Sequence, residues 1–209
     1  DCRYLVTKES GSTGGFMEKY EAARKAGARL VLIGRPVKEE GLSLTECKKV
    51  LIDTFSIQTE QKITLVGIGM GTADGMTKEA QTACEEADLL IGARRMTLET
   101  AHPGQAVYHA YKPQEIADYI ASHKELEKVA VVLSGDVGFY SGAKKLLEVL
   151  PPQTTLIPGI SSMICFLAKL KMPWEDVAPC SMHGRSLNMI SMVREHQKVF
   201  AIVGEKDGI

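Results

Sequence analysis

The sequence has no long apolar segment. No stretch reaches the roughly 18 consecutive apolar residues that a membrane-spanning helix needs. The amino end, Asp1-Cys2-Arg3, has neither the basic region nor the apolar core of a signal peptide. We therefore expect a soluble, cytoplasmic protein with no membrane partner.

A large excess of charge of either sign is also missing. Lys and Arg number 25 and Asp and Glu 26, which leaves a net charge of −1 over 209 residues. Because nucleic acid binding depends mostly on cationic contacts to phosphates, we expect no nucleic acid partner. Hydrophobic residues make up 44% of the chain, enough for the core of one large domain or of two small ones.

Paired cysteines are absent. The five cysteines are scattered without a CxxC pair, their number is odd, and the histidines show no ligand spacing. We therefore expect reduced thiols, no disulfide and no metal site. Cys84 and Cys165 fall within helical apolar patterns and are expected to be buried.

What the chain does have is a regular alternation of strand-like and helix-like segments, which starts afresh after a polar stretch at 56–62. The expected strands are 3–7, 29–34, 63–66, 88–91, 106–109, 128–133, 154–157, 177–182 and 198–203. The expected helices are 15–26, 45–55, 78–87, 113–122, 141–149, 160–169 and 187–195.

This alternation predicts an α/β fold with a mostly parallel sheet and helices on both faces. The stretch 56–62 is expected to link an N-terminal βαβ unit to the sheet domain. The last strand has no helix after it, and the chain starts in mid-pattern without an initiator methionine. We therefore expect a fragment: the tail of one domain at 1–55, a whole domain at 63–172, and the start of a further α/β domain at 173–209.

Three glycine-bearing loops each follow a strand-like run directly. They are Gly67-Ile68-Gly69-Met70-Gly71 after ITLV, Gly135-Asp136-Val137-Gly138-Phe139-Tyr140 after VAVVLS, and Pro158-Gly159-Ile160-Ser161-Ser162 after TTLI. Glycine lets main-chain amides approach a ligand closely, and open α/β sheets bind their ligands at the carboxyl ends of parallel strands. We expect these loops to bind a nucleotide-like cofactor.

The first loop alone is a weak signal, because tight strand-to-helix turns also use glycine. A GxGxxG dinucleotide motif would need a third glycine where the chain has Thr72, and an acid at the end of the second strand. Neither is present. Arg94 and Arg95 after that strand would still suit a 2′-phosphate, so an NADP-dependent reductase remains an alternative.

Polar and aromatic side chains in the other two loops each have two interpretations. Asp136 accepts hydrogen bonds from a ligand or from backbone amides of its own turn, or it caps the next helix. Phe139 and Tyr140 contact a ligand or belong to the core. Ser161 and Ser162 hold the edge of a ligand or cap the helix they begin, and capping is the commoner role.

In this order and spacing, the runs ITLVGIGMG, LSGDVGFYSGAKKL and LIPGISSMICFLAKLKMPW resemble the tetrapyrrole methylases, which use S-adenosylmethionine to methylate corrin and sirohaem precursors. The resemblance covers residues 62–209. The stretch SMHGR at 181–185 is most similar to the precorrin-6Y C5,15-methyltransferase branch, whose anaerobic counterpart is cobalt-precorrin-7 C5-methyltransferase. Met70 and Val137 depart from the family, which usually or often has proline there, so each position lacks a φ restraint.

The first 55 residues have a likeness of their own. The motif VTKESG at 6–11 and the later IGRP at 33–36 resemble the carboxyl end of precorrin-6A reductase, which reduces the macrocycle with NADPH. The two enzymes act at neighbouring steps. The resemblance therefore implies a fusion of a reductase to a methyltransferase.

The methylase resemblance implies S-adenosyl-L-methionine as the cofactor, with NADPH needed only by a complete reductase. The residues expected to bind the cofactor are Gly67, Gly69, Met70, Gly71, Ser134, Gly135, Asp136, Gly138, Phe139, Tyr140, Ser161 and Ser162. The corrin precursor carries many carboxylates, so Arg94, Arg95, His183 and Arg185 are expected to bind the substrate. No catalytic residue is assigned, because C5 of the substrate is expected to attack the methyl group directly.

The resemblance further implies a homodimer and leaves open a partner that methylates C15 and decarboxylates the ring. Whether the substrate carries cobalt is not decided by the sequence. The alternative from another class is a fragment without catalytic activity, kept for dimerisation or as a scaffold.

Overall fold

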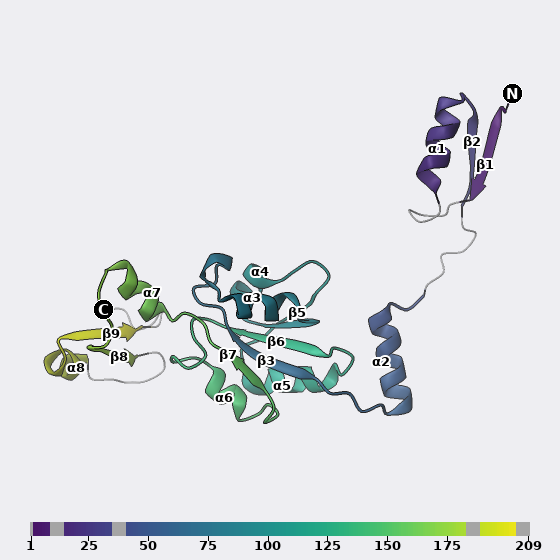
Figure 1. The fold of residues 1–209 in the computed structure, drawn as a ribbon. Coiled ribbons are helices and arrows are strands. Elements are labelled where there is room, and N and C mark those ends of the chain that lie inside the picture. The colour runs from purple at the N-terminus through teal and green to yellow at the C-terminus, as the bar shows by residue number, and fades with distance from the viewer. Residues whose placement is uncertain (1, 9–14, 35–40, 183–188, 204–209) are drawn as a thin grey trace. The chain divides into compact units, whose positions relative to one another are not determined.

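The computed structural model describes residues 2–8, 15–34, 41–182 and 189–203 (Figure 1). The chain divides into two compact units, Asp1–Ser43 and Leu44–Ile209. Among the described residues, no helix is both long and apolar enough to cross a membrane. Helix α2 (Leu44–Phe55) belongs to the second unit, where the Lys48 Nζ donates to Glu127 Oε1 at 2.9 Å. The domain boundaries expected from the sequence stay predictions.

The first unit is a small βαβ arrangement, as the sequence predicts. Strand β1 (Tyr4–Lys8) pairs in parallel with β2 (Arg29–Ile33), and helix α1 (Phe16–Lys25) connects them. Gly27 follows the helix with a φ of 65°, a left-handed conformation that glycine adopts without steric cost. The helix therefore ends where the chain must turn back into β2.

The second unit is built on a five-stranded sheet in the order β5-β4-β6-β3-β7, in which every pair of neighbouring strands is parallel. The α/β fold class predicted from the sequence is confirmed. The strands are β3 (Lys62–Gly67), β4 (Leu89–Gly92), β5 (Ala106–His109), β6 (Lys128–Leu133) and β7 (Thr155–Ile157). The helices are η2 (Ala73–Gly75), α3 (Lys78–Glu85), α4 (Arg94–Thr100), α5 (Pro113–Ser122), α6 (Ala143–Leu147) and α7 (Ser162–Lys169).

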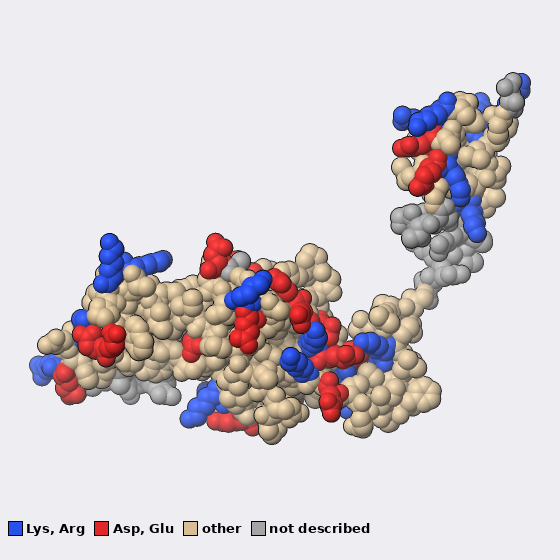
Figure 2. Space-filling view, viewed as in Figure 1, with Lys and Arg blue, Asp and Glu red and all other residues tan. Residues whose placement is uncertain are grey.

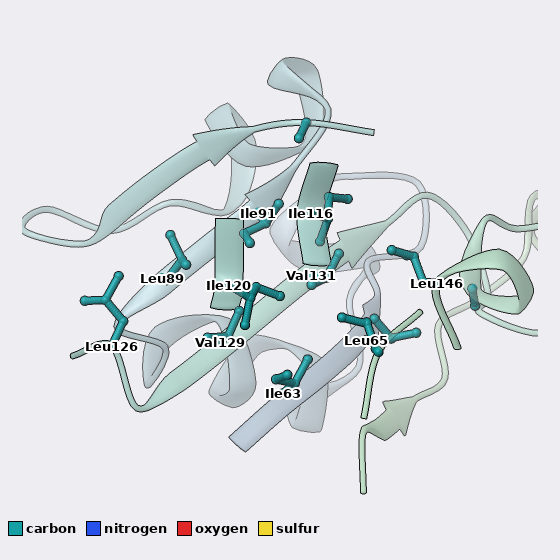
Figure 3. Close-up of a cluster of buried hydrophobic side chains, with 13 residues drawn as sticks. Ile63, Leu65, Leu89, Ile91, Ile116, Ile120, Leu126, Val129, Val131 and Leu146 are labelled. Atoms are coloured by element: carbon teal, nitrogen blue, oxygen red, sulfur yellow. The ribbon is translucent and has the colours of Figure 1, made fainter. Parts of the chain in front are cut away.

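One face of this sheet packs against α5 and α6. Successive side chains of a strand point to opposite faces, so Ile63 and Leu65 of β3 lie on one face. Figure 3 shows them with Val131 of β6 and with Ile116 and Ile120 of α5 in a single buried cluster. Full burial of an aliphatic side chain contributes about 1.5–3 kcal/mol, so this cluster is a major source of stability.

The other face packs against α3 and α4. Val66 of β3 and Leu90 of β4 are fully buried there against Ala80 and Cys84 of α3. Cys84 is buried, which confirms the expectation, and burial raises the pKa of its thiol to about 11. Cys165 is only half-buried, and the expectation of full burial was wrong for it.

After α7 the chain forms a separate two-stranded parallel sheet. Its strands β8 (Val177–Ser181) and β9 (Lys198–Ile202) are connected through helix α8 (Met189–Glu195). Val177 packs with Met163 and Leu167 of α7, and Phe200 lies against the same cluster. The strands and helix expected after residue 173 are therefore present.

Candidate functional site

The three glycine loops meet at one edge of the sheet. They follow β3, β6 and β7, which are neighbours in the strand order, and parallel strands end at the same edge. The Gly69 N–H donates to the Gly135 carbonyl at 3.1 Å, and the Gly135 N–H donates back to the Gly69 carbonyl at 2.7 Å. The first two loops are thus held together through their main chains.

Three glycines of these loops touch backbone to backbone. A Cβ added to Gly67 would lie 2.6 Å from the Gly159 nitrogen and 2.8 Å from the Gly135 oxygen. Real Cβ atoms do not come so close to backbone atoms. Gly135 also has a φ of 72°, which other residues rarely adopt. We call Gly67, Gly135 and Gly159 the glycine junction.

The carboxylate of Asp136 connects the second and third loops. Its Oδ1 accepts from the Gly138 N–H at 2.8 Å, within its own turn, and its Oδ2 accepts from the Gly159 N–H at 3.0 Å. The N-cap of α6 is Gly142, with no side-chain cap bond. The capping interpretation of Asp136 was therefore wrong, and hydrogen bonding to backbone amides is confirmed.

The other polar and aromatic residues of the loops also have definite partners. The Ser161 hydroxyl caps α7, accepting from the Ile164 N–H at 3.3 Å. Phe139 packs against the buried cluster around α7 and β8. The Tyr140 hydroxyl donates to the Pro179 carbonyl at 2.9 Å, and Tyr140 has a positive φ of 50°. Capping by Ser161 and a core position for Phe139 are thus confirmed.

The cap predicts a measurable effect of Ser161→Ala. Losing an N-cap hydroxyl costs about 1 kcal/mol, so the free energy of unfolding in urea should fall by about that amount. Ser162→Ala, at the first position inside the same helix, is the matched control and should leave the unfolding midpoint nearly unchanged. Equal loss in the two variants would contradict the capping role.

A cavity of about 770 Å³ opens where β4, β5 and β6 end. Gly92 ends β4 and Ala110 follows β5, while Ser134 directly precedes the second loop and Tyr140 ends it. Small-molecule sites usually have volumes of about 300–1,000 Å³. The position and the size of this cavity are therefore those of a ligand site.

A smaller cavity of about 170 Å³ lies beside the first loop and shares Met96 and Ser134 with the large one. Met70, Gly71 and Arg95 also line it. Arg94 lines neither cavity, and its carbonyl accepts from the Thr97 hydroxyl at 3.1 Å.

The predicted site residues thus divide into three groups. Met70, Gly71, Ser134, Tyr140 and Arg95 line a cavity. The residues that line neither cavity, most of which hold the loops in place, are Gly67, Gly69, Arg94, Gly135, Asp136, Gly138, Phe139, Ser161 and Ser162. His183 and Arg185 lie outside the described residues.

Three lysines that the sequence analysis does not single out also line the large cavity. They are Lys112, directly before α5, and Lys144 and Lys145 in α6. The signal available in the sequence is the Lys-Lys pair in LSGDVGFYSGAKKL, close after the second loop. The sequence analysis does not use this signal, because two lysines in a helical pattern normally lie on a solvated surface.

Two known protein families match separate parts of the chain. The family profile of the Tetrapyrrole (Corrin/Porphyrin) Methylases matches residues 62–200, and that of Precorrin-6x reductase CbiJ/CobK matches residues 1–52. The chain is 31% identical over 153 residues to the probable cobalt-precorrin-7 C(5)-methyltransferase of Methanocaldococcus jannaschii, covering 66% of this chain and 69% of that protein.

Two further relatives extend the comparison. Identity is 27% over 148 residues to the cobalt-precorrin-7 C(5)-methyltransferase of Salmonella typhimurium, covering 70% of this chain and 73% of that protein. The crystal structure of the methyltransferase CobJ shares the fold with a TM-score of 0.52 at 22% identity. That match covers 65% of this chain and 62% of the CobJ chain.

Proposed function

The chain belongs to the tetrapyrrole (corrin/porphyrin) methylases, and we propose on this basis that its second unit methylates C5 of a corrin precursor of the precorrin-6/7 type. It is a methyltransferase that uses S-adenosyl-L-methionine in cobalamin biosynthesis. The assignment of C5 as the methylated carbon is supported by relatives of the chain from two organisms, which are named as cobalt-precorrin-7 C(5)-methyltransferases.

The observation that supports this proposal most is the meeting of three glycine loops beside two adjoining cavities. Methyl transfer from a sulfonium needs alignment of donor and acceptor and exclusion of water, and it needs no enzyme nucleophile. Loops fixed by main-chain contacts at the glycine junction provide such alignment. When bound, the S-adenosyl group would supply an electrophilic methyl group, and the loops would hold it in line with C5 of the substrate.

The smaller cavity fits the amino-acid end of the donor. Arg95 and Glu99, one turn apart on α4, both line it and make no salt bridge to one another in the described part of the chain. A zwitterion carries one carboxylate and one ammonium group, and this pair offers one charge to each. In this proposal Arg95 binds the cofactor, in place of the substrate role expected from the sequence.

We also propose that the methyltransferase is fused to a reductase of the same pathway, of which the first unit is a part. Its profile match to precorrin-6x reductase spans residues 1–52. We assign NADPH to that reductase activity and not to the glycine loops of the second unit. A homodimer is also part of the proposal, and it is supported by the family resemblance alone.

Binding of S-adenosylhomocysteine to the full chain tests the proposed function. We expect saturable binding by calorimetry and, at one hundred times the Kd, a stabilisation of about 2.7 kcal/mol. In a parallel thermal-shift series, adding NADPH should not reduce the stabilisation by S-adenosylhomocysteine. Binding of NADPH with no binding of S-adenosylhomocysteine would instead support the alternative of an NADP-dependent reductase.

A further inference from the structure

The 770 Å³ cavity carries charge of one sign. Lys112, Lys144 and Lys145 line it, and none of the described residues in its lining is acidic. Elsewhere on the visible surface of the second unit, basic and acidic side chains are interspersed (Figure 2). Because the charged groups in its lining are all cations, the cavity has a positive potential, which attracts an anionic ligand.

These lysines differ from the paired lysines of the same unit. Lys48, Lys128 and Lys198 each form a salt bridge with a carboxylate, at 2.7 to 3.0 Å. The three lysines of the cavity make no ion pair within the part of the chain that the structure describes. Their ammonium groups are therefore available to a ligand.

Most of the remaining lining is apolar or aromatic, and Ser134 and Ser141 add two hydroxyl groups. Ile116, Val131 and Leu146 contribute aliphatic surface that continues the core. Tyr111 and Tyr140 line the same cavity with exposed fractions of 77% and 47%. An apolar interior with a few charged groups suits an amphipathic ligand with a flat apolar body and anionic substituents.

We propose that Lys112, Lys144 and Lys145 bind peripheral carboxylates of the tetrapyrrole, so that this cavity receives one edge of the ring. The inference rests on the proposed function and specifies how its substrate is recognised. Lysine suits this task because a point charge on a flexible stem can follow acetate and propionate groups at several positions. Met96 and Ser134 line both cavities, so the edge of the ring and the methyl donor would adjoin at these two residues.

The test measures binding of uroporphyrin, a tetrapyrrole with acetate and propionate side chains, to the full chain by fluorescence titration. The cavity variant carries Lys112→Gln, Lys144→Gln and Lys145→Gln. We expect it to bind uroporphyrin about tenfold more weakly, since each exposed ion pair contributes a few tenths to 1 kcal/mol. Changing the same lysines to arginine should restore most of the affinity.

The matched control carries Lys49→Gln, Lys124→Gln and Lys169→Gln, which change the net charge equally but line neither cavity. Its affinity for uroporphyrin should stay within about twofold of the parent chain. Equal weakening in the two variants, or no binding by the parent, would overturn the inference. Binding of S-adenosylhomocysteine is measured on every variant: its retention keeps the proposed function standing even where the lysine assignment fails.

Discussion

Gly67→Ala is expected to lower the free energy of unfolding of the second unit by about 2 to 3 kcal/mol. The added methyl would lie 2.6 Å from the Gly159 nitrogen and 2.8 Å from the Gly135 oxygen. Both are backbone atoms that cannot rotate away. Strand β3 lies between β6 and β7, so the strain must separate the three loops or shift the strands that carry them.

Urea unfolding followed by far-UV circular dichroism measures this effect. Gly142→Ala is the matched control, because a Cβ there meets only the Leu133 Cδ2, at 3.9 Å, and φ is −72°. We expect the free energy of unfolding of the control to lie within about 0.5 kcal/mol of that of the parent chain. A Gly67→Ala protein as stable as the control would show that the loops do not touch as described.

Asp136→Ala is expected to loosen the connection between the second and third loops. The carboxylate accepts from the Gly138 and Gly159 amides, and hydrogen bonds to a charged group contribute about 1.5–3 kcal/mol each. Because Asp136 is partly exposed, we expect a total loss near the lower end, about 2 kcal/mol. The stability of Asp136→Asn should lie between those of the parent chain and Asp136→Ala. The asparagine keeps one acceptor oxygen but turns an amide NH₂ toward the other N–H.

The affinity for S-adenosylhomocysteine separates two roles of Asp136. If Asp136 positions the loops, stability and affinity fall together in Asp136→Ala, the affinity by about tenfold. Asp53→Ala, which removes a carboxylate from α2 far along the sequence, is the control and should change neither. A loss of affinity at unchanged stability would mean instead that the carboxylate contacts the cofactor itself.

Much of the fold could be predicted because the sequence pattern is local. Strands β3 and β6 are rich in Val, Ile and Leu and have glycine at or shortly after their ends, and their expected bounds agree with the structure to within a residue. Helix α4 is not predicted, because RRMTLET is short, its apolar residues are few, and Ala93 gives no side-chain cap. Its buried Thr97 is held by tertiary packing that no local pattern reveals.

The candidate site was harder to predict, because its contacts join residues far apart in the sequence. The bond from the Gly159 N–H to the Asp136 carboxylate crosses from one strand end to another, so position alone favoured a helix cap equally. The lysines of α6 and Lys112 come together only when β5 and β6 take their places around β4. Loop glycines show where a site is formed, but the charges around it depend on strand order.

That strand order also constrains how the protein is made. The neighbours of β3 in the sheet are β6 and β7, which begin at Lys128 and Thr155. While a ribosome is synthesising the first half of the second unit, only β4 and β5 have a strand to pair with. Pairing across such long sequence separations is slow. The nascent chain therefore exposes the apolar edges of β3 until β6 and β7 have been synthesised, and exposed strand edges of this kind favour aggregation.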